Sequence, residues 1–176
     1  CARTFGFHLA VLDVRQNSGF HDRAVGQLLA AAGFDDADYV GWDPARRRDF
    51  LTRELASPRP LVRPGRAVGA EAEAVLESYR VLVDHLRRHG PDGLGALIVS
   101  MTRDVSDLLV VYLFAREVGL EVETPDGPAC PLAVVPLFET IDDLERSPEI
   151  LKAFLDHPAT RRSLALRRER AGMERP

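Results

Sequence analysis

A guanidinium and a carboxamide stand at the exit of a long apolar segment near the start of the chain. Arg15 and Gln16 follow residues 5–14, which are apolar apart from His8 and Asp13. An apolar run without alternation is typical of a buried strand in a parallel sheet. Polar donors after such a strand lie where α/β proteins place their sites. The fork of Arg15 suits a phosphate or carboxylate ligand, and an ion pair with a neighbouring Asp or Glu is an equally good interpretation.

A lone carboxylate stands in the equivalent position after another apolar segment. Glu139 follows residues 131–138, and it has no helix-capping duty in the sequence pattern. A carboxylate in that place either forms an ion pair or binds a metal ion. Because the carboxyl ends of parallel strands share one edge of a sheet, Arg15 and Glu139 are predicted to converge at one rim. These residues alone indicate an anionic ligand, with a divalent ion as a further option, and they do not name a reaction.

Other chemistry-bearing residues have simpler interpretations. His85 and His89 lie four apart in a helical stretch, but no carboxylate completes a zinc motif, so helix-end chemistry is the better explanation. Cys1 and Cys130 give neither a metal spacing nor a disulfide framework. The sequence contains no glycine-rich phosphate loop, GxSxG elbow, CxxC motif or internal repeat. Mostly solvated helix faces are predicted for the arginines at positions 46, 47, 48, 161, 162, 167, 168 and 170.

Strands and helices must position these side chains, and the spacing of apolar residues along the sequence predicts a helix-rich α/β fold. Strands are predicted at residues 5–14, 94–101 and 131–138. Helices are predicted at residues 20–32, from Pro44, at 67–89 and 105–118, again from Ser147–Pro148, and from Thr160. Residues 94–138 fit a right-handed strand–helix–strand unit, whereas residues 19–93 form a helical insert between the first two strands.

Acidic residues at several predicted helix starts have capping duties. Asp43 is predicted to cap the helix that begins at Pro44. Asp107 is expected to satisfy backbone donors in the first turn of its own helix. Asp142 or Asp143 is expected to cap the helix after the third strand. These carboxylates are therefore set apart from Glu139, which keeps its place as the candidate ligand.

Composition and charge describe an ordinary soluble globular protein. The 176 residues are 45% apolar and 28% charged, enough for one domain with a sizeable core. A net charge of −4 argues against a nucleic-acid partner. No apolar run is long enough for a membrane span and no signal-peptide pattern occurs, so we expect a cytoplasmic location without a membrane partner. The start at Cys1 and the charged close lead us to expect a piece of a longer protein.

Four separated motifs together resemble one enzyme family. They are FGFHLAVLDVRQNSGFH from Phe5, LTRELASPRP from Leu51, SMTRDVSDLLVVYL from Ser100 and VVPLFETIDDLE from Val134. In this order they resemble phosphoenolpyruvate carboxylase, from about residue 4 to the end of the chain. The resemblance implies a segment of a large, mostly helical homotetramer built around an eight-stranded β/α barrel, so that residues 1–176 form a partial barrel. It implies carboxylation of phosphoenolpyruvate with bicarbonate to oxaloacetate and phosphate, with Mg²⁺ or Mn²⁺.

The resemblance also implies roles for individual residues. Arg15 matches the arginine that binds the substrate phosphate and acts in catalysis, and Gln16 beside it is the second substrate-binding candidate. Glu139 matches one of two carboxylate ligands of the metal. Ser18 and His21 match the same signature as Gln16, and all three are given supporting or structural roles only.

Parts of the family pattern are missing from the 176 residues. The catalytic histidine motif is expected upstream, and the second metal carboxylate, in a Gly-Tyr-Ser-Asp-Ser motif, is expected beyond Pro176. The remaining barrel strands are also missing, so the segment by itself is expected to be inactive. Two alternatives stay open, namely a non-catalytic helical α/β module and another barrel enzyme that acts on phosphorylated acids.

Overall fold

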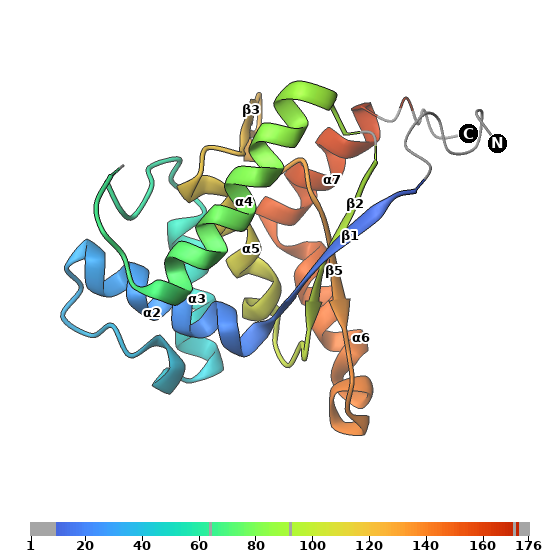
Figure 1. The fold of residues 1–176 in the computed structure, drawn as a ribbon. Coiled ribbons are helices and arrows are strands. Elements are labelled where there is room, and N and C mark those ends of the chain that lie inside the picture. Colours follow the sequence, from blue (N-terminus) through green and yellow to red (C-terminus); the bar gives the residue numbers. More distant parts are fainter. Residues whose placement is uncertain (1–9, 64, 92, 171, 173–176) are drawn as a thin grey trace.

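The computed structural model describes residues 10–63, 65–91, 93–170 and 172. Helices dominate it, and a small parallel sheet lies along one side of the molecule (Figure 1). The first half contains β1 (Leu12–Asn17), α2 (Ser18–Ala32), the 3₁₀ helix η1 (Tyr39–Gly41), α3 (Pro44–Glu54) and α4 (Ala70–His89). The second half contains β2 (Leu94–Ser100), α5 (Val105–Glu117), β3 (Val122–Thr124), β4 (Gly127–Ala129), β5 (Ala133–Leu137), α6 (Ile141–Asp156) and α7 (Pro158–Arg170). The helix-rich α/β class predicted from the sequence is confirmed.

The main sheet has the order β1-β2-β5, and both of its strand pairs are parallel. Three α-helices lie between β1 and β2 along the chain, and α5 with the β3–β4 hairpin lies between β2 and β5. Leu97 and Val99 of β2 are buried, so their face of the sheet packs against the helices. Because side chains alternate between the faces of a strand, the residues between them point to the opposite, open face.

The first strand differs from its prediction in both position and burial. The predicted strand covered residues 5–14, of which 5–9 lie outside the described residues, and the observed strand extends to Asn17. Val11 and Leu12 are largely exposed, so a strand buried on both faces is wrong for this part. The physical reason is that β1 pairs with β2 alone among the described strands and lies at the edge of the sheet. Main-chain pairing does not depend on side-chain polarity, and the polar residues therefore continue the strand.

Helix α5 forms the centre of the hydrophobic core. All of its residues from Val105 to Arg116 are buried, because it contacts α2, α3, α4 and α6 as well as β5. Its sequence is apolar on nearly every side, which is typical of a helix without a solvent face. Figure 1 shows α5 between α4 and the sheet, and α5 contacts β5.

Several helix boundaries follow the predicted signals. Gly33 ends α2 in the left-handed conformation, with φ of 85°. Asp43 caps α3 by accepting a hydrogen bond from the Arg46 amide, and Pro44 is its first residue. At α5, Asp104 and Asp107 form a reciprocal capping box, so the first-turn duty expected of Asp107 is confirmed.

Helix α6 corrects two predictions. Its N-cap is Thr140, whose hydroxyl accepts from the Asp143 amide at 3.1 Å, so neither Asp142 nor Asp143 is the cap. The helix also continues through Pro148 instead of restarting there. Proline cannot donate to the carbonyl four residues earlier. The Ser147 hydroxyl donates to that carbonyl, of Leu144, at 2.7 Å, and this bond replaces the missing one.

A short antiparallel hairpin between α5 and β5 was not predicted. Strands β3 and β4 pair from Val122–Ala129 to Thr124–Gly127. The turn sequence Thr-Pro-Asp-Gly was the available signal, since proline, aspartate and glycine favour tight turns. Arg162 of α7 donates to the Pro128 carbonyl at 2.9 Å, which ties the hairpin to the last helix. Arg162 is therefore not a solvated side chain as predicted.

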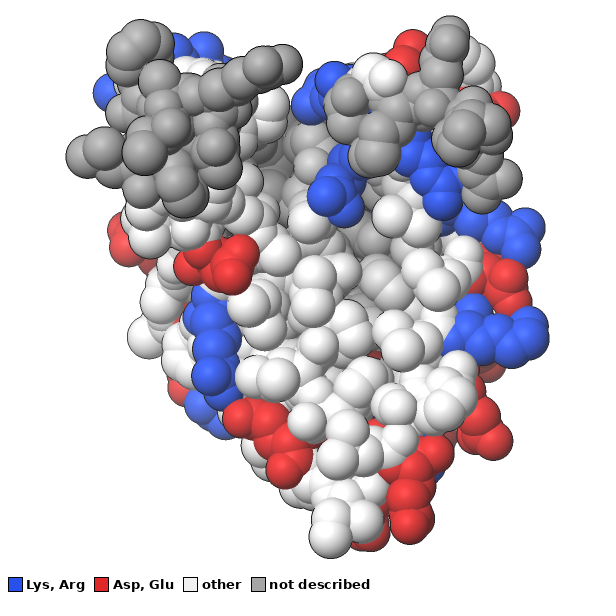
Figure 2. Space-filling view, turned by 90° about the vertical axis from the view of Figure 1, so that its right-hand side faces the viewer, with Lys and Arg blue, Asp and Glu red and all other residues white. Residues whose placement is uncertain are grey.

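One side of the molecule presents a broad uncharged surface with a hollow. Figure 2 shows it, with acidic and basic side chains gathered toward the margins. Large apolar side chains that remain exposed include Leu12, Val135, Ile141 and Leu144. Among the described residues no helix has the length and apolar character needed to cross a membrane.

Candidate functional site at the carboxyl edge of the sheet

The candidate site lies where the three parallel strands end. Arg15, Ile98 and Val135 stand opposite one another in one row across β1, β2 and β5. The Arg15 side chain is 56% exposed, and Val135 is exposed as well, so this row lies on the open face of the sheet. Arg15 belongs to β1 itself, two positions before its end, instead of following the strand as predicted.

Arg15 and Glu139 meet at this edge. The Arg15 Nη2 atom donates to Glu139 Oε1 at 2.9 Å. Glu139 follows β5 by two residues and is 32% exposed, so the convergence at one rim predicted from the sequence is confirmed. In this state each residue is the ion-pair partner of the other. The pair is open to solvent, which limits its contribution to about 1 kcal/mol or less and leaves both charges accessible to a ligand.

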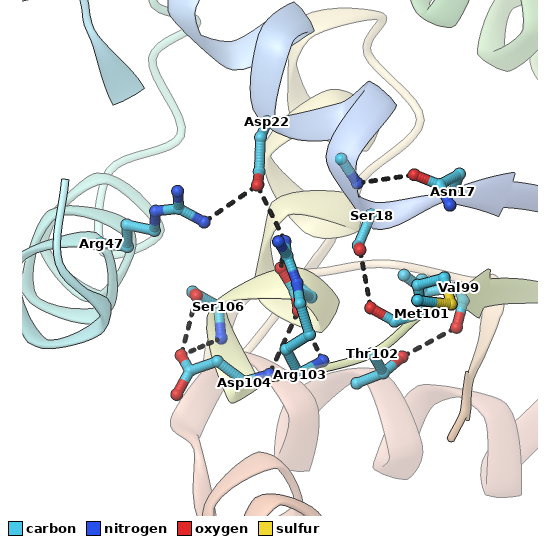
Figure 3. Close-up of polar contacts among 12 residues, drawn as sticks. Asn17, Ser18, Asp22, Arg47, Val99, Met101, Thr102, Arg103, Asp104 and Ser106 are labelled. Atoms are coloured by element: carbon cyan, nitrogen blue, oxygen red, sulfur yellow. Dashed lines mark hydrogen bonds and ion pairs between the residues drawn. The ribbon is translucent and has the colours of Figure 1, made fainter. Parts of the chain in front are cut away.

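The second oxygen of Glu139 is held by the backbone of the turn after β2. Glu139 Oε2 accepts a hydrogen bond from the Met101 amide at 2.9 Å. Met101 has φ of 56°, in the left-handed region, and it is the one non-glycine residue with positive φ in the part of the chain that the structure describes. The Ser18 hydroxyl donates to the Met101 carbonyl at 2.7 Å, a contact visible in Figure 3. The carboxylate is therefore fixed on one side by main chain and on the other by Arg15.

Gln16 does not join Arg15 on the open face. It stands opposite Val99, which is fully buried on the helix side of the sheet. Its side-chain oxygen accepts a hydrogen bond from the Asn17 amide at 2.8 Å. A contact between Gln16 and substrate stays a prediction, and the structure shows only this local hydrogen bond at the end of β1.

A charge network that is buried except for Arg103 lies beside the site, and it was missed from the sequence. Asp22 Oδ2 accepts from Arg47 at 2.9 Å and from Arg103 at 2.8 Å, as Figure 3 shows. Arg103 also donates to Asp107 at 3.0 Å, so the network joins α2, α3 and α5. The Arg47 side chain is only 11% exposed, and its predicted place on a solvated face is wrong. Burial raises the pKa of Asp107, and Arg103 opposes that shift.

The reason for this miss is that three charges from distant segments meet under the carboxyl edge of β2. The triple-arginine run gave no sign that its middle member turns inward. A helical period applied to α3 was the available signal, because Arg47 lies three and four positions before the buried Phe50 and Leu51. Arg48, the next residue, is 46% exposed and pairs with Asp104 at 3.0 Å.

His21 occupies the core beneath the site. It is fully buried, its ring lies 5.2 Å from that of Phe114, and neither ring nitrogen has a hydrogen-bond partner among the described residues. Burial lowers the pKa of His21 to about 4. The side chain is therefore neutral near pH 7 and packs as an aromatic group, which agrees with the structural role expected for it.

The side chains at the carboxyl edge of the sheet can be compared with the ligands that a divalent metal ion requires. Within the ranges that the structure describes, no group of three or more His, Cys, Asp or Glu side chains is arranged to hold a metal ion. Glu139 offers one hard oxygen ligand at the open edge, its Oε1 atom. Mg²⁺ commonly uses one or two carboxylates and fills its other positions with water and substrate oxygens. Glu139 therefore fits as one ligand of such an ion, although the described residues alone do not complete the site. His85 and His89 lie in ring contact at 5.3 Å and form no part of this edge.

The fold and this edge define a helix-rich α/β protein with an exposed arginine–glutamate pair at the carboxyl ends of parallel strands. The sequence model of the phosphoenolpyruvate carboxylase family matches residues 1–172. The chain belongs to the phosphoenolpyruvate carboxylase family.

Curated relatives agree with this family assignment. The chain is 44% identical over 173 residues to a phosphoenolpyruvate carboxylase of Rhodothermus marinus, covering 94% of this chain. It is 42% identical over 168 residues to one of Aromatoleum aromaticum, covering 96% of this chain. It is 39% identical over 165 residues to one of Mycobacterium avium, covering 94% of this chain. The chain spans 18% of the length of each of these relatives.

Proposed function

We propose that this chain is a segment of an enzyme that carboxylates phosphoenolpyruvate with bicarbonate to give oxaloacetate and phosphate. The family membership supports the reaction class. The single observation that carries the site is the meeting of Arg15 and Glu139 at the open carboxyl edge. That edge brings a cation suited to phosphate next to a carboxylate suited to a divalent ion.

In the proposed mechanism Arg15 binds the substrate phosphate. Its guanidinium offers two parallel donors that match two phosphate oxygens, and it neutralises charge as the phosphoryl group is transferred. A bicarbonate oxygen attacks phosphorus, the bond from phosphorus to the enolate oxygen breaks, and carboxyphosphate and enolate are formed. Carboxyphosphate then releases carbon dioxide and phosphate, and the enolate carbon attacks carbon dioxide to form oxaloacetate.

Glu139 is proposed as a ligand of Mg²⁺ or Mn²⁺. When bound, the ion would supply positive charge close to the developing enolate oxygen. Glu139 itself has two tasks in this scheme. In the absence of ligands it holds Arg15 in place, and on loading it gives up Arg15 to the phosphate. Gln16 is proposed to assist by shaping the strand end that carries Arg15.

The proposal extends to the architecture and setting of the whole enzyme. We propose that residues 1–176 form part of a β/α barrel, with residues 19–93 inserted between its first two strands here. Both outer strands of the described sheet have a free edge, and its open face carries exposed apolar side chains, which supports this. A homotetrameric, cytoplasmic enzyme is the setting that we propose, without nucleic-acid or membrane partners.

The function is tested by measuring oxaloacetate formation in a full-length enzyme that contains this segment. Wild type with Mg²⁺ or Mn²⁺ is expected to turn over phosphoenolpyruvate, and Glu139→Gln is expected to lose most of that activity. Other phosphorylated acids, assayed in parallel, test the alternative of a different barrel enzyme. Undiminished, metal-dependent turnover in Glu139→Gln would exclude the role of Glu139.

The segment by itself gives a further test. Because one carboxylate holds a hard divalent ion weakly and catalytic groups that act together fail together, the isolated 176 residues are expected to be inactive. Turnover by the segment that disappears in its Glu139→Gln variant would show that the segment carries a complete site.

A further inference from the structure

The turn after β2 contains an unfavourable backbone conformation next to the candidate site. Met101 has φ of 56°, which an L-residue with a long side chain rarely adopts. Such a conformation persists only where the surrounding structure holds it, and it is concentrated at functional positions. The contacts that hold Met101 in this conformation are therefore the place to look for a functional role of the turn.

Both sides of the Met101 residue are engaged. Its amide donates to Glu139 Oε2 at 2.9 Å, and its carbonyl accepts from the Ser18 hydroxyl at 2.7 Å. Ser18 is 1% exposed and is the first residue of α2, so its hydroxyl is part of a rigid element. One chain of hydrogen bonds thus runs from the start of α2 through Met101 to the carboxylate of Glu139.

The neighbouring residue provides a natural comparison. Thr102 is fully buried, and its hydroxyl donates to the Val99 carbonyl at 2.8 Å. This bond stabilises the same turn but does not touch Met101 or Glu139. The hydroxyls of Ser18 and Thr102 are therefore similar in burial, and each donates to one carbonyl. Only the Ser18 hydroxyl bonds to Met101, the residue whose amide holds the Glu139 carboxylate.

We propose that Ser18 is a positioning residue that orients Glu139 through the Met101 peptide. By holding the carbonyl of Met101, Ser18 keeps the left-handed conformation in place and directs the Met101 amide at Oε2. Oε1 of Glu139, which pairs with Arg15 in this structure, is then the oxygen that is available to a divalent ion once Arg15 moves away. This inference rests on the proposed function, in which Glu139 binds a divalent ion.

The experiment measures Mn²⁺ affinity in a full-length enzyme that contains this segment. The dissociation constant is obtained from the electron paramagnetic resonance signal of free Mn²⁺, and thermal unfolding is recorded without metal. Ser18→Ala is expected to raise the dissociation constant about tenfold, a loss typical of residues that orient a metal ligand. Thr102→Val is expected to lower the unfolding temperature to a similar extent while leaving the dissociation constant unchanged.

A double variant separates positioning from general destabilisation. Glycine adopts positive φ without a steric penalty, so Met101→Gly no longer needs Ser18 to hold this conformation. Met101→Gly combined with Ser18→Ala is therefore expected to recover part of the Mn²⁺ affinity lost in Ser18→Ala. A purely structural role of Ser18 predicts no such recovery, because the lost hydrogen bond is not restored.

The outcomes distinguish the two levels of the proposal. If Glu139→Gln leaves Mn²⁺ affinity unchanged, the metal role of Glu139 fails. If Glu139→Gln abolishes binding while Ser18→Ala leaves it unchanged, the positioning role alone is overturned. Equal losses in Ser18→Ala and Thr102→Val would also overturn it. Should Ser18→Ala not fold, the comparison passes to the double variant, where Mn²⁺ affinity no better than that of Glu139→Gln contradicts the inference.

Discussion

The Arg15 guanidinium donates to the Glu139 carboxylate over 2.9 Å, although 124 positions separate the two residues in sequence. In this ion pair the carboxylate of Glu139 competes with an anionic ligand for Arg15, and the guanidinium of Arg15 competes with a cation for Glu139. A phosphate that takes Arg15 and a cation that takes Glu139 both require this pair to open. Since the pair is solvent-exposed, opening it costs about 1 kcal/mol or less. Binding of either ligand thus releases the partner residue for the second ligand.

The first prediction follows from this mutual occupation. In metal-free full-length enzyme, Glu139→Gln should tighten the binding of inorganic phosphate, because Arg15 loses its competing carboxylate. The expected gain is roughly fivefold, which corresponds to about 1 kcal/mol. Titration calorimetry provides the dissociation constants.

Asp13→Asn is the matched control for that experiment. Asp13 lies in the same strand, two residues before Arg15. Its carboxylate accepts from the Ala96 amide at 2.7 Å, and no arginine among the described residues pairs with it. The substitution changes the charge equally, so it separates a general field effect from release of Arg15. Equal gains in both variants, or no gain in Glu139→Gln, would contradict the prediction.

The second prediction concerns the geometry of phosphate binding. Arg15→Lys in the full-length enzyme should lower kcat/KM for phosphoenolpyruvate, because an ammonium cannot form two parallel hydrogen bonds. The expected loss is about 1–3 kcal/mol of transition-state stabilisation. Steady-state kinetics measure it, with Arg80→Lys on the exposed face of α4 as the control. Unaltered kcat/KM in Arg15→Lys would show that Arg15 has only a structural role.

The third prediction compares two adjacent arginines of α3. Arg47→Met leaves buried Asp22 with Arg103 as its one remaining ion-pair partner among the described residues, and it removes a link between α2 and α3. Breaking a buried pair is expected to cost about 2–4 kcal/mol. Arg48→Met removes the half-exposed pair with Asp104, for which about 1 kcal/mol or less is expected. Thermal unfolding of the full-length variants should show the larger decrease for Arg47→Met, and equal decreases would refute a stabilising network.

The positions of strands and helices along the chain were predicted from the sequence better than the burial of individual charged side chains. The positions of β2 and β5, the glycine end of α2 and the meeting of Arg15 with Glu139 followed from local apolar runs and from the geometry of parallel strands. These features depend on residues that are close in sequence or on one general rule of sheet topology. They were therefore predictable without a structure.

The charge network and the left-handed turn were not predictable in this way. Asp22, Arg47 and Arg103 come from three distant segments, and only their packed positions reveal them as partners. Methionine carries no preference for positive φ, so nothing in the sequence marks position 101. Thr140 was overlooked as a cap because two aspartates follow it, although the residue before the helix is the one whose side chain can reach the third amide.

The fourth prediction is a pH dependence that originates at His21. The folded protein keeps this buried ring neutral, with a pKa of about 4, whereas the unfolded chain binds a proton near the ordinary value of 6.5. The free energy of unfolding is therefore unaffected by His21 above pH 6.5 and falls as the pH decreases from 6.5 to 4. The total contribution is roughly 3 kcal/mol, the equivalent of a shift of that size.

His21→Leu tests this dependence because leucine fills the site without a titratable group. Unfolding temperatures of wild type and variant are compared at a series of pH values between 7 and 4. The variant is expected to gain stability relative to wild type as the pH falls, whatever constant offset the substitution introduces. A difference that does not vary with pH would show that His21 does not resist protonation in the folded state.

The position of β1 in the sheet has a consequence for synthesis of the protein. β1 pairs with β2 alone among the described strands, and Leu12 stands opposite Leu94. The partner strand is thus made only after the whole helical insert. At ribosomal rates of about 5–20 residues per second, the wait is roughly 4–16 s. During that interval α2, α3 and α4 emerge, so these helices can assemble before β1 is able to pair with β2.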